Sequence, residues 1–409
     1  MTSLSSAPPR HRYLYLDGVR GCAALMVALS HFILALHPAM LGGTQVPTHF
    51  AAAVALSHSP LVAFYNPQLG VTIFFVLSGF VLAASVADRP AWFPELAMRR
   101  WLRLALPILG SSLLVWPLAR YQLFYNGPAA TYTKSDWLAG NYLWIGFEPA
   151  SMVNLVFQSF IDIFARAKHA YNPALWTMPI EFWGSLILFA GYALLPGVFA
   201  AREGGLLIGA FAVALLWQTR YAGFAYGLLL FEAMRAAQRL PPATLGRLAT
   251  GAPWAGVGLL GAGILAGGMP YALNLPEPGL YEHIFLLLGP MLPRPVELLH
   301  DLGATMIVAG VLLWRPAQHL LERPLFVYLG RISFMLYLVH VPVLCSLISW
   351  LVLRLVPLMG YNRTSLLLLV VFYVTVIVLA DLATRAFDEP AIRLSRQAGQ
   401  ALTACLRRG

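Results

Sequence analysis

The residues best suited to chemistry lie in an apolar stretch near the start of the chain. The run 18–39 is apolar enough to cross a bilayer, yet Asp17, Arg20 and His31 lie at or inside it. Arg20 and His31 are eleven residues apart, almost three helical turns, so both project from one face about 16 Å apart along the axis. Asp17 lies one turn before Arg20 and faces nearly the same way. Ionisable groups inside a membrane span usually face a cavity, a partner or a substrate path, so we expect this helix to form one wall of a site.

His31 is the strongest candidate for chemistry in this stretch. A lone histidine in an apolar helix is more often a packed core residue, but here three polar groups share one face and Ser30 neighbours the imidazole. We therefore interpret His31 as functional. The role of Arg20 stays open: its side chain either belongs to the site or extends to the cytoplasmic membrane surface.

A second polar group lies in the fourth apolar run, where Glu181 follows Trp176. In a span that enters from the outer side, Glu181 lies about 9 Å deep by helical rise. His31 rises from the inner side and lies about 20 Å up a hydrocarbon core about 30 Å thick. We expect the two side chains at a similar depth, where a carboxylate can orient an imidazole and raise its basicity.

Arg100 and Arg103 share a helix face at the expected cytoplasmic edge of the third span. Such a pair can bind phosphates bidentately or anchor the helix to anionic lipid headgroups, and residue type alone does not decide. Asp388 and Glu389 end the tenth span at the same membrane face. We expect these acids to form structural ion pairs with Arg20, Arg100 or Arg103.

A polar stripe is predicted in the ninth span, where Ser333, Tyr337 and His340 occur at positions i, i+4 and i+7. The role of His340 stays open: its side chain either forms part of the wall of a site or makes a structural hydrogen bond. Pro342 predicts a kink near the middle of the membrane. Ser78 lies in the second span beside a glycine, where close helix packing is the favoured reading of each small residue taken singly.

Long apolar runs must position these side chains. Of the 409 residues, 59% are hydrophobic and only 11% are charged, whereas soluble proteins carry about 25% charged residues. The fold class is therefore predicted to be all-α, a polytopic membrane bundle of about ten helices. The expected spans are 18–39, 69–87, 101–119, 175–197, 204–219, 221–237, 252–269, 300–315, 327–353 and 364–386. The segment 281–292 is expected to be a re-entrant helix, an interfacial helix or an eleventh span.

The placement of arginine and lysine predicts that both termini are cytoplasmic. Residues 1–396 are expected to form one transmembrane domain, followed by a short basic cytoplasmic tail at 397–409. The largest outer loop, 120–173, contains an amphipathic run at 152–164 that we expect to lie along the membrane interface or to cap the bundle. The aromatic and amide side chains of this loop are typical either of carbohydrate contact or of an interfacial aromatic belt.

Several kinds of site are absent from the sequence. The net charge of +10 is scattered between the spans, unlike the continuous basic surface of a nucleic-acid-binding protein. Cys22, Cys345 and Cys405 have no metal-ligand spacing, and no phosphate-binding loop, metal motif or nucleophile elbow occurs. We expect no metal and no nucleic-acid partner, and a multi-pass protein of the plasma or inner cell membrane.

Six motifs that occur in order resemble the acyltransferase family 3 of integral-membrane acyltransferases over essentially the whole chain. They are Leu16–Gly21 with His31, Gly70–Phe80, Arg99–Leu104, Leu175–Phe182, Leu329–Pro342 and Asp388–Pro390. The resemblance implies transfer of an acyl group, commonly acetyl from acetyl-CoA, to a hydroxyl of a carbohydrate or another cell-envelope or secreted molecule. Acyl-CoA is then a donor substrate, and no permanently bound cofactor is implied. Some members carry a C-terminal hydrolase-like domain, and this chain resembles the stand-alone form without one.

The resemblance also implies roles for particular residues. The family's Arg-ten-residues-His pattern matches Arg20 and His31, and its Arg-x-x-Arg pattern matches Arg100 and Arg103. Its fourth-span acid matches Glu181. His31 is expected to be the general base or a transient acyl carrier, and Arg20 to bind the thioester carbonyl, the pantetheine arm or an acidic partner. The arginine pair would hold the anionic end of CoA at the cytoplasmic mouth, and Glu181 would orient His31 or contact the acceptor.

The remaining side chains expected to contact substrate are Asp17, Ser78, Trp176, Tyr337 and His340. The acceptor is expected to be a carbohydrate or a lipid-linked glycan, and a homo-oligomer is left open. Intramembrane His, Arg and Glu are equally typical of transport paths, so a secondary transporter or export permease for a glycan or small molecule is the alternative function. Many transporters have two related halves, and we find no such duplication.

Overall fold

The computed structural model describes residues 13–87, 92–142, 151–201, 203–270 and 279–406. Within these ranges all regular elements are helices and none is a strand. By length and composition, eight helical segments of these ranges can cross a membrane. They are α1 (Leu14–Leu36), α4 (Pro67–Val86), α5 (Phe93–Arg120), η4 (Pro173–Thr177) with α10 (Met178–Leu194), α14 (Pro242–Gly267), α16 (Pro295–Leu313), α18 (Pro324–Val343) with η5 (Leu344–Ile348) and α19 (Ser349–Met359), and α20 (Tyr361–Ala383) with η6 (Thr384–Asp388) and α21 (Glu389–Leu406).

Each predicted span coincides with a helix, so the all-α membrane class is confirmed. The runs 204–219 and 221–237 form α12 (Gly204–Leu216) and α13 (Ala222–Gln238), which have 13 and 17 residues. Eight spans are therefore supported, and ten spans stay a prediction. The 281–292 segment forms α15 (Leu280–Leu288), whose 9 residues are too few for an eleventh span. Outside the large loop between α5 and α10, the other short helices in the described ranges are α2 (Ala39–Gly42), η1 (Gly43–Gln45), α3 (Ala52–Ser57), η2 (Pro60–Tyr65), α11 (Pro196–Ala200) and α17 (Arg315–Leu321).

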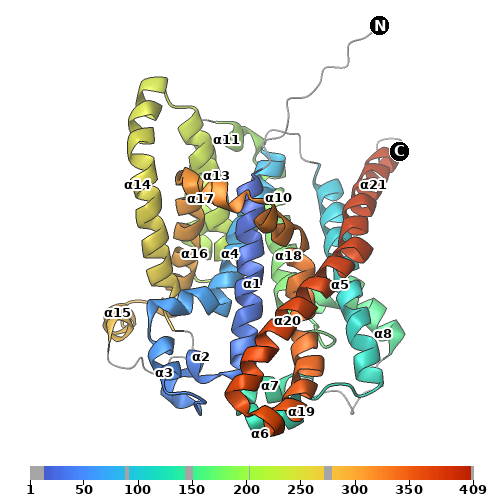
Figure 1. Ribbon diagram of the computed structural model, residues 1–409. Helices are drawn as coiled ribbons and strands as arrows, with labels where there is room; N and C mark the ends of the chain where they lie inside the picture. The colour runs from blue at the N-terminus through green and yellow to red at the C-terminus, as the bar shows by residue number, and fades with distance from the viewer. Residues whose placement is uncertain (1–12, 88–91, 143–150, 202, 271–278, 407–409) are drawn as a thin grey trace.

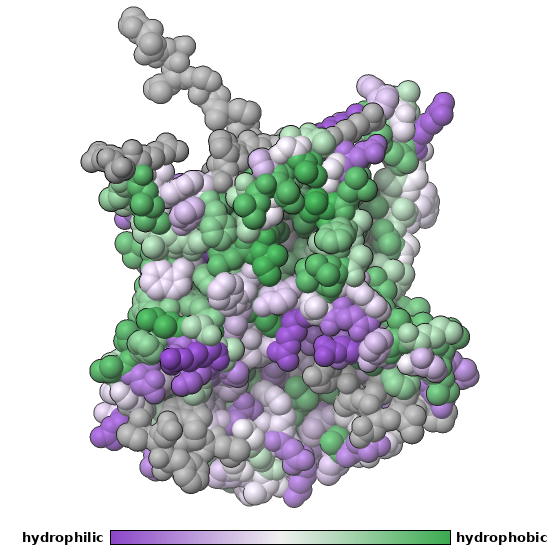
Figure 2. Space-filling model, turned by 180° about the vertical axis from the view of Figure 1, so that it is seen from behind, coloured by the Kyte–Doolittle hydropathy of each residue, from purple (hydrophilic) through white to green (hydrophobic). Residues whose placement is uncertain are grey.

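Helix α1 lies at the centre of the bundle, where it packs against α18 and α4 (Figure 1). Helices α20 and α5 pack on α18, α13 and α16 pack on α4, and α21 runs along α5. The beginning of α1 and the end of α21 lie on the same side of the bundle (Figure 1). On the face shown in Figure 2, hydrophobic residues form a broad band with hydrophilic residues below it, as expected for a body that crosses a bilayer. Which membrane face carries the termini stays a prediction.

Glycines bring α1 and α18 into close contact. A Cβ on Gly21 would lie 2.7 Å from the backbone nitrogen of Gly330, and a Cβ on Gly330 would overlap the carbonyl oxygen of Asp17. Small residues allow helix backbones to approach in this way inside a membrane. The contact fixes the register of the two helices that carry the polar residues of the first and ninth predicted spans.

Pro342 lies inside α18 without ending it. Proline has no N–H, so the carbonyl of Leu338, four residues earlier, loses its helical partner. The side chain of Asn172 donates a hydrogen bond to that carbonyl at 2.6 Å. The helix then passes through the π turn η5, which is the local irregularity at the predicted kink. Asn172 thus joins the start of the fourth span to α18.

The large loop between α5 and α10 forms short helices. They are α6 (Asn126–Thr133), α7 (Asp136–Gly140), α8 (Met152–Phe157), η3 (Gln158–Asp162) and α9 (Ile163–Arg166). Helices α6 and α7 lie at the end of the bundle opposite the described chain ends (Figure 1). The run 152–164 lies against α5 and α10, because Trp101 Nε1 donates to the Phe160 carbonyl at 2.8 Å and Trp183 Nε1 to the Phe164 carbonyl at 2.9 Å. Its place relative to the membrane interface stays a prediction.

Candidate active site

A cavity of about 110 Å³ lies between α1, α4, α5, α10 and α18. Six of the predicted site residues line it, namely Arg20, Ser78, Arg100, Arg103, Glu181 and Tyr337. The rest of the lining is Val71, Phe74, Phe75, Leu104, Thr177, Met178, Ser333 and Phe334. We call this the arginine cavity. Its polar wall comes from five helices, so only the assembled bundle can form it.

Glu181 is held by two donors inside the arginine cavity. Arg100 Nη2 lies 2.5 Å from one carboxylate oxygen, and Ser78 Oγ lies 2.9 and 3.1 Å from the two oxygens. The side chains of Arg100 and Glu181 are only 17% and 11% exposed. A close, charge-assisted pair in such surroundings is much stronger than one in water. Ser78 therefore has a polar role in addition to the packing expected for it.

This pair corrects two predictions. Arg100 and Glu181 were expected near opposite membrane faces, yet they touch, because α5 begins at Phe93 and so places Arg100 about 10 Å inside the helix. Glu181 was also expected at the depth of His31, either to orient His31 or to contact the acceptor. Among the described residues, its carboxylate contacts the guanidinium and the hydroxyl instead, since a positive charge attracts a carboxylate more strongly than a neutral imidazole does.

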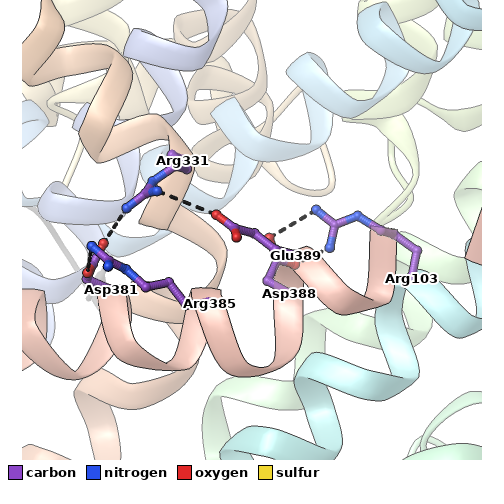
Figure 3. A network of polar contacts seen from close by, with 6 residues as sticks. All are labelled: Arg103, Arg331, Asp381, Arg385, Asp388 and Glu389. Carbon is purple, nitrogen blue, oxygen red and sulfur yellow. Dashed lines mark hydrogen bonds and ion pairs between the residues drawn. The ribbon is translucent and has the colours of Figure 1, made fainter. Parts of the chain in front are cut away.

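Arg103 forms a two-pronged ion pair with Asp388, which confirms the structural pairing expected for that acid (Figure 3). Glu389 pairs with a different arginine, Arg331, at 3.4 Å. Arg331 also binds Asp381 (Figure 3). These contacts fasten α5 and α18 to the π turn η6 at the junction of α20 and α21.

Arg20 has no ion pair with any residue in the described ranges. The Nε atom of Arg100 is buried and has no hydrogen-bond partner there either. Three guanidinium groups therefore share the cavity wall, and two carboxylates, Glu181 and Asp388, balance two of them. The excess positive charge suits an anionic or carbonyl-bearing ligand better than a metal cation.

His31 lies outside the arginine cavity and faces His340 of α18. His340 Nε2 is 3.1 Å from His31 Nδ1, and the rings are 4.9 Å apart. His31 Nδ1 is also 2.9 Å from the Val27 carbonyl, and His340 Nδ1 is 2.7 Å from the Tyr337 carbonyl. Trp137 of α7 covers His31 with ring centroids 5.1 Å apart. We call His31 and His340 the histidine pair.

Tyr337 connects the two groups. Its side chain lines the arginine cavity and hydrogen-bonds Thr177 Oγ1 at 3.1 Å, while its ring centroid is 5.7 Å from that of His340. Asp17 and Trp176 do not line the cavity. Asp17 packs against α18, and Trp176 stacks on the guanidinium of Arg220.

Sequence reasoning missed Trp137, Thr177 and Asn172. Trp137 had no sequence signal, because loop packing alone brings it to His31. Thr177 follows the predicted site residue Trp176 directly, so its position in the cavity wall could have been predicted. Asn172 could have been found through Pro342, whose missing N–H requires an outside donor for a carbonyl.

Comparison with known proteins shows that the sequence is similar to acyltransferases. The model of the acyltransferase domain family, which the six motifs of this sequence resemble, matches residues 13–385. The O-acetyltransferase PaAT-1 of Phomopsis amygdali is 26% identical over 96% of this chain and 85% of its own length. The acyltransferase clz18 of Cochliobolus lunatus is 22% identical over 82% of this chain and 83% of its own length. No solved structure matches the chain.

Proposed function

Since this chain belongs to the acyltransferase family 3, which makes it an acyl-transferring enzyme, we propose that it is a membrane O-acyltransferase that uses acyl-CoA. The acyl group is acetyl, and the acceptor is a hydroxyl of a carbohydrate or another cell-envelope or secreted molecule. The Phomopsis amygdali relative is named an O-acetyltransferase, which supports an acetyl group as the cargo and an oxygen atom as the acceptor. The proposed location is the plasma or inner cell membrane.

One observation carries the proposal: helices α1 and α18, which carry the histidine pair, also supply part of the wall of the positively charged cavity, and Tyr337 lies between the two groups. Arg20 is the cavity cation without a carboxylate partner among the described residues, and we assign it to the donor. Along α1, Arg20 and His31 are about 16 Å apart, which is too far for both to hold one carbonyl. Arg20 therefore binds the donor away from its reacting end, and the pantetheine arm reaches past Tyr337 toward His31.

His31 is assigned as the general base. The imidazole takes the proton of the acceptor hydroxyl while that oxygen attacks the thioester carbonyl. The C–S bond then breaks, the acyl group stays on the acceptor oxygen, and the CoA thiolate takes the proton from the imidazolium. General-base catalysis of this kind contributes about 10²- to 10⁴-fold to the rate.

The roles of Arg100, Arg103 and Glu181 follow from their contacts. The two arginines are held by carboxylates, so we propose that they shape the cavity and raise its potential, and that Arg20 supplies the direct contact. Glu181 positions Arg100. These assignments replace direct binding of the CoA phosphates by a free arginine pair.

The test uses purified protein in lipid nanodiscs with radiolabelled acetyl-CoA and a panel of sugars, lipid-linked glycans and small alcohols. The proposal predicts label in at least one acceptor, together with stoichiometric release of CoA. Flux of an acceptor across proteoliposomes without acetylation would contradict it and favour a transporter.

A further inference from the structure

The hydrogen bonds of the histidine pair determine which nitrogen of each ring carries a proton. His340 Nδ1 lies 2.7 Å from the Tyr337 carbonyl, and a carbonyl only accepts hydrogen bonds. His340 Nδ1 must therefore carry the proton that it donates. A neutral imidazole has only one N–H, so His340 Nε2 is then an acceptor.

The neutral state of His340 follows from its surroundings. Its side chain is 0% exposed, and none of its hydrogen-bond partners in the described ranges is a carboxylate. An imidazolium buried without an anion is costly. Its neighbour across the helix contact is His31, a second imidazole.

His31 is consequently the donor in this contact. Its Nδ1 lies 3.1 Å from His340 Nε2 and 2.9 Å from the Val27 carbonyl. Both neighbours are acceptors, so one Nδ1–H shared between them satisfies the geometry, whereas a bare Nδ1 would face two lone pairs. His31 Nε2 is then the nitrogen with the free electron pair.

We propose that His340 is a positioning residue that holds His31 as the Nδ1–H tautomer and so makes Nε2 the nitrogen that receives the acceptor proton. This inference rests on the proposed function, in which His31 is the base. It has the general logic of a base oriented by a third group, with a neutral imidazole as that group. It also corrects the expectation that His340 contacts substrate, because His340 is fully buried and does not line the cavity.

Two substitutions at one position separate this role from simple packing. In His340→Gln, the amide oxygen can take the place of Nε2 and accept from His31. In His340→Asn, the amide can still donate to the Tyr337 carbonyl, but the side chain is too short to reach His31. We expect His340→Gln to keep kcat within about 10-fold of wild type and His340→Asn to lose about 100-fold, with the KM of acetyl-CoA and of the acceptor unchanged in both. Equal kcat in the two variants, or an effect confined to the acceptor KM, would overturn the inference.

A second readout does not depend on activity. Nitrogen-15 NMR of histidine-labelled protein in nanodiscs distinguishes the two tautomers, and the difference spectrum with His31→Gln assigns the His31 signal. We expect an Nδ1–H signal in wild type and in His340→Gln, and a mixture in His340→Asn. An Nε2–H signal in wild type overturns the inference even if acetyl transfer is intact. Absence of acetyl transfer with an Nδ1–H signal instead rejects the proposed function and leaves the geometry standing.

Discussion

The arginine cavity and the histidine pair share helices α1 and α18, but they are built in opposite ways. The cavity is organised by full charges: Glu181 pairs with Arg100 and Asp388 pairs with Arg103. Arg20 has no carboxylate partner among the described residues. The histidine pair is organised by neutral groups: the two imidazoles contact each other, and the Nδ1 atom of each lies within hydrogen-bonding distance of a backbone carbonyl. The difference separates two tasks: net positive charge suits the binding of an anionic donor, and a neutral imidazole suits the acceptance of a proton.

The largest effect is expected at the histidine pair. His31→Ala removes the base and should lower kcat for acetyl transfer by about 10³-fold, while donor affinity stays within about twofold of wild type because the cavity is untouched. Radiolabel transfer and equilibrium binding of acetyl-CoA measure the two quantities. His319, on α17 and 77% exposed, supplies a matched control: His319→Ala should behave as wild type. Normal turnover by His31→Ala would show that His31 is not the general base.

In the arginine cavity, Glu181→Gln should cost both stability and activity. Arg100 would keep its buried charge without a carboxylate, a loss of about 3 kcal/mol for a buried pair, and kcat/KM should fall about 100-fold as the cavity changes shape. Glu232→Gln is the control, because Glu232 is also buried and bonded, to Tyr192 at 2.5 Å, but away from the cavity. It should lower the thermal midpoint with kcat/KM retained. Equal losses of kcat/KM in both variants would mean that Glu181 acts only through stability.

Arg20→Gln tests the division of tasks from the cavity side. A charge-assisted hydrogen bond is worth about 1.5–3 kcal/mol, so donor binding should weaken by about 10- to 100-fold, with kcat at saturating donor within a few-fold. Arg120→Gln, at the exposed end of α5, should leave donor binding unchanged. A collapse of kcat at saturating donor would place Arg20 at the reacting carbonyl instead.

Asn172→Ala tests the hydrogen bond that joins the start of the fourth span to α18, the helix that contributes to both regions. The Leu338 carbonyl would lose its donor inside the bundle, which costs about 1–3 kcal/mol. We expect a lower midpoint of thermal unfolding in detergent. Asn172→Asp, which cannot donate, should be at least as damaging as the alanine variant. A more stable aspartate variant would show that the hydrogen bond is not what matters.

The smallest effect is expected just beyond the end of α1. Burial, and then the charge of nearby His49, lowers the pKa of His37 to about 4. In unfolded chains the pKa of histidine is about 6.5. Between about pH 6.5 and pH 4 the unfolded state therefore binds a proton that the folded state does not bind, so the free energy of unfolding decreases as the pH falls. His37→Phe should flatten this acid loss by a few degrees of thermal midpoint. An unchanged pH profile would assign the acid sensitivity to other groups.

Much of the site could be predicted from spacing within single helices. The face shared by Arg20 and His31, and the stripe with Tyr337 and His340, depend only on helical periodicity, and the structure brings both helices together. Contacts between helices were harder to predict. The Arg100–Glu181 pair was missed because its depth depends on where α5 begins, and Phe93 lies well before the apolar run.

The central claim is that donor binding belongs to the arginine cavity and proton transfer to the histidine pair. The most direct test measures acetyl-CoA affinity and single-turnover acetyl transfer on the same nanodisc samples of His31→Gln and Arg20→Gln. We predict that His31→Gln binds donor as wild type does and transfers label about 10³-fold more slowly, whereas Arg20→Gln binds donor weakly and transfers label normally once saturated. Weak donor binding by His31→Gln, with the bound donor reacting at the wild-type rate, would contradict it.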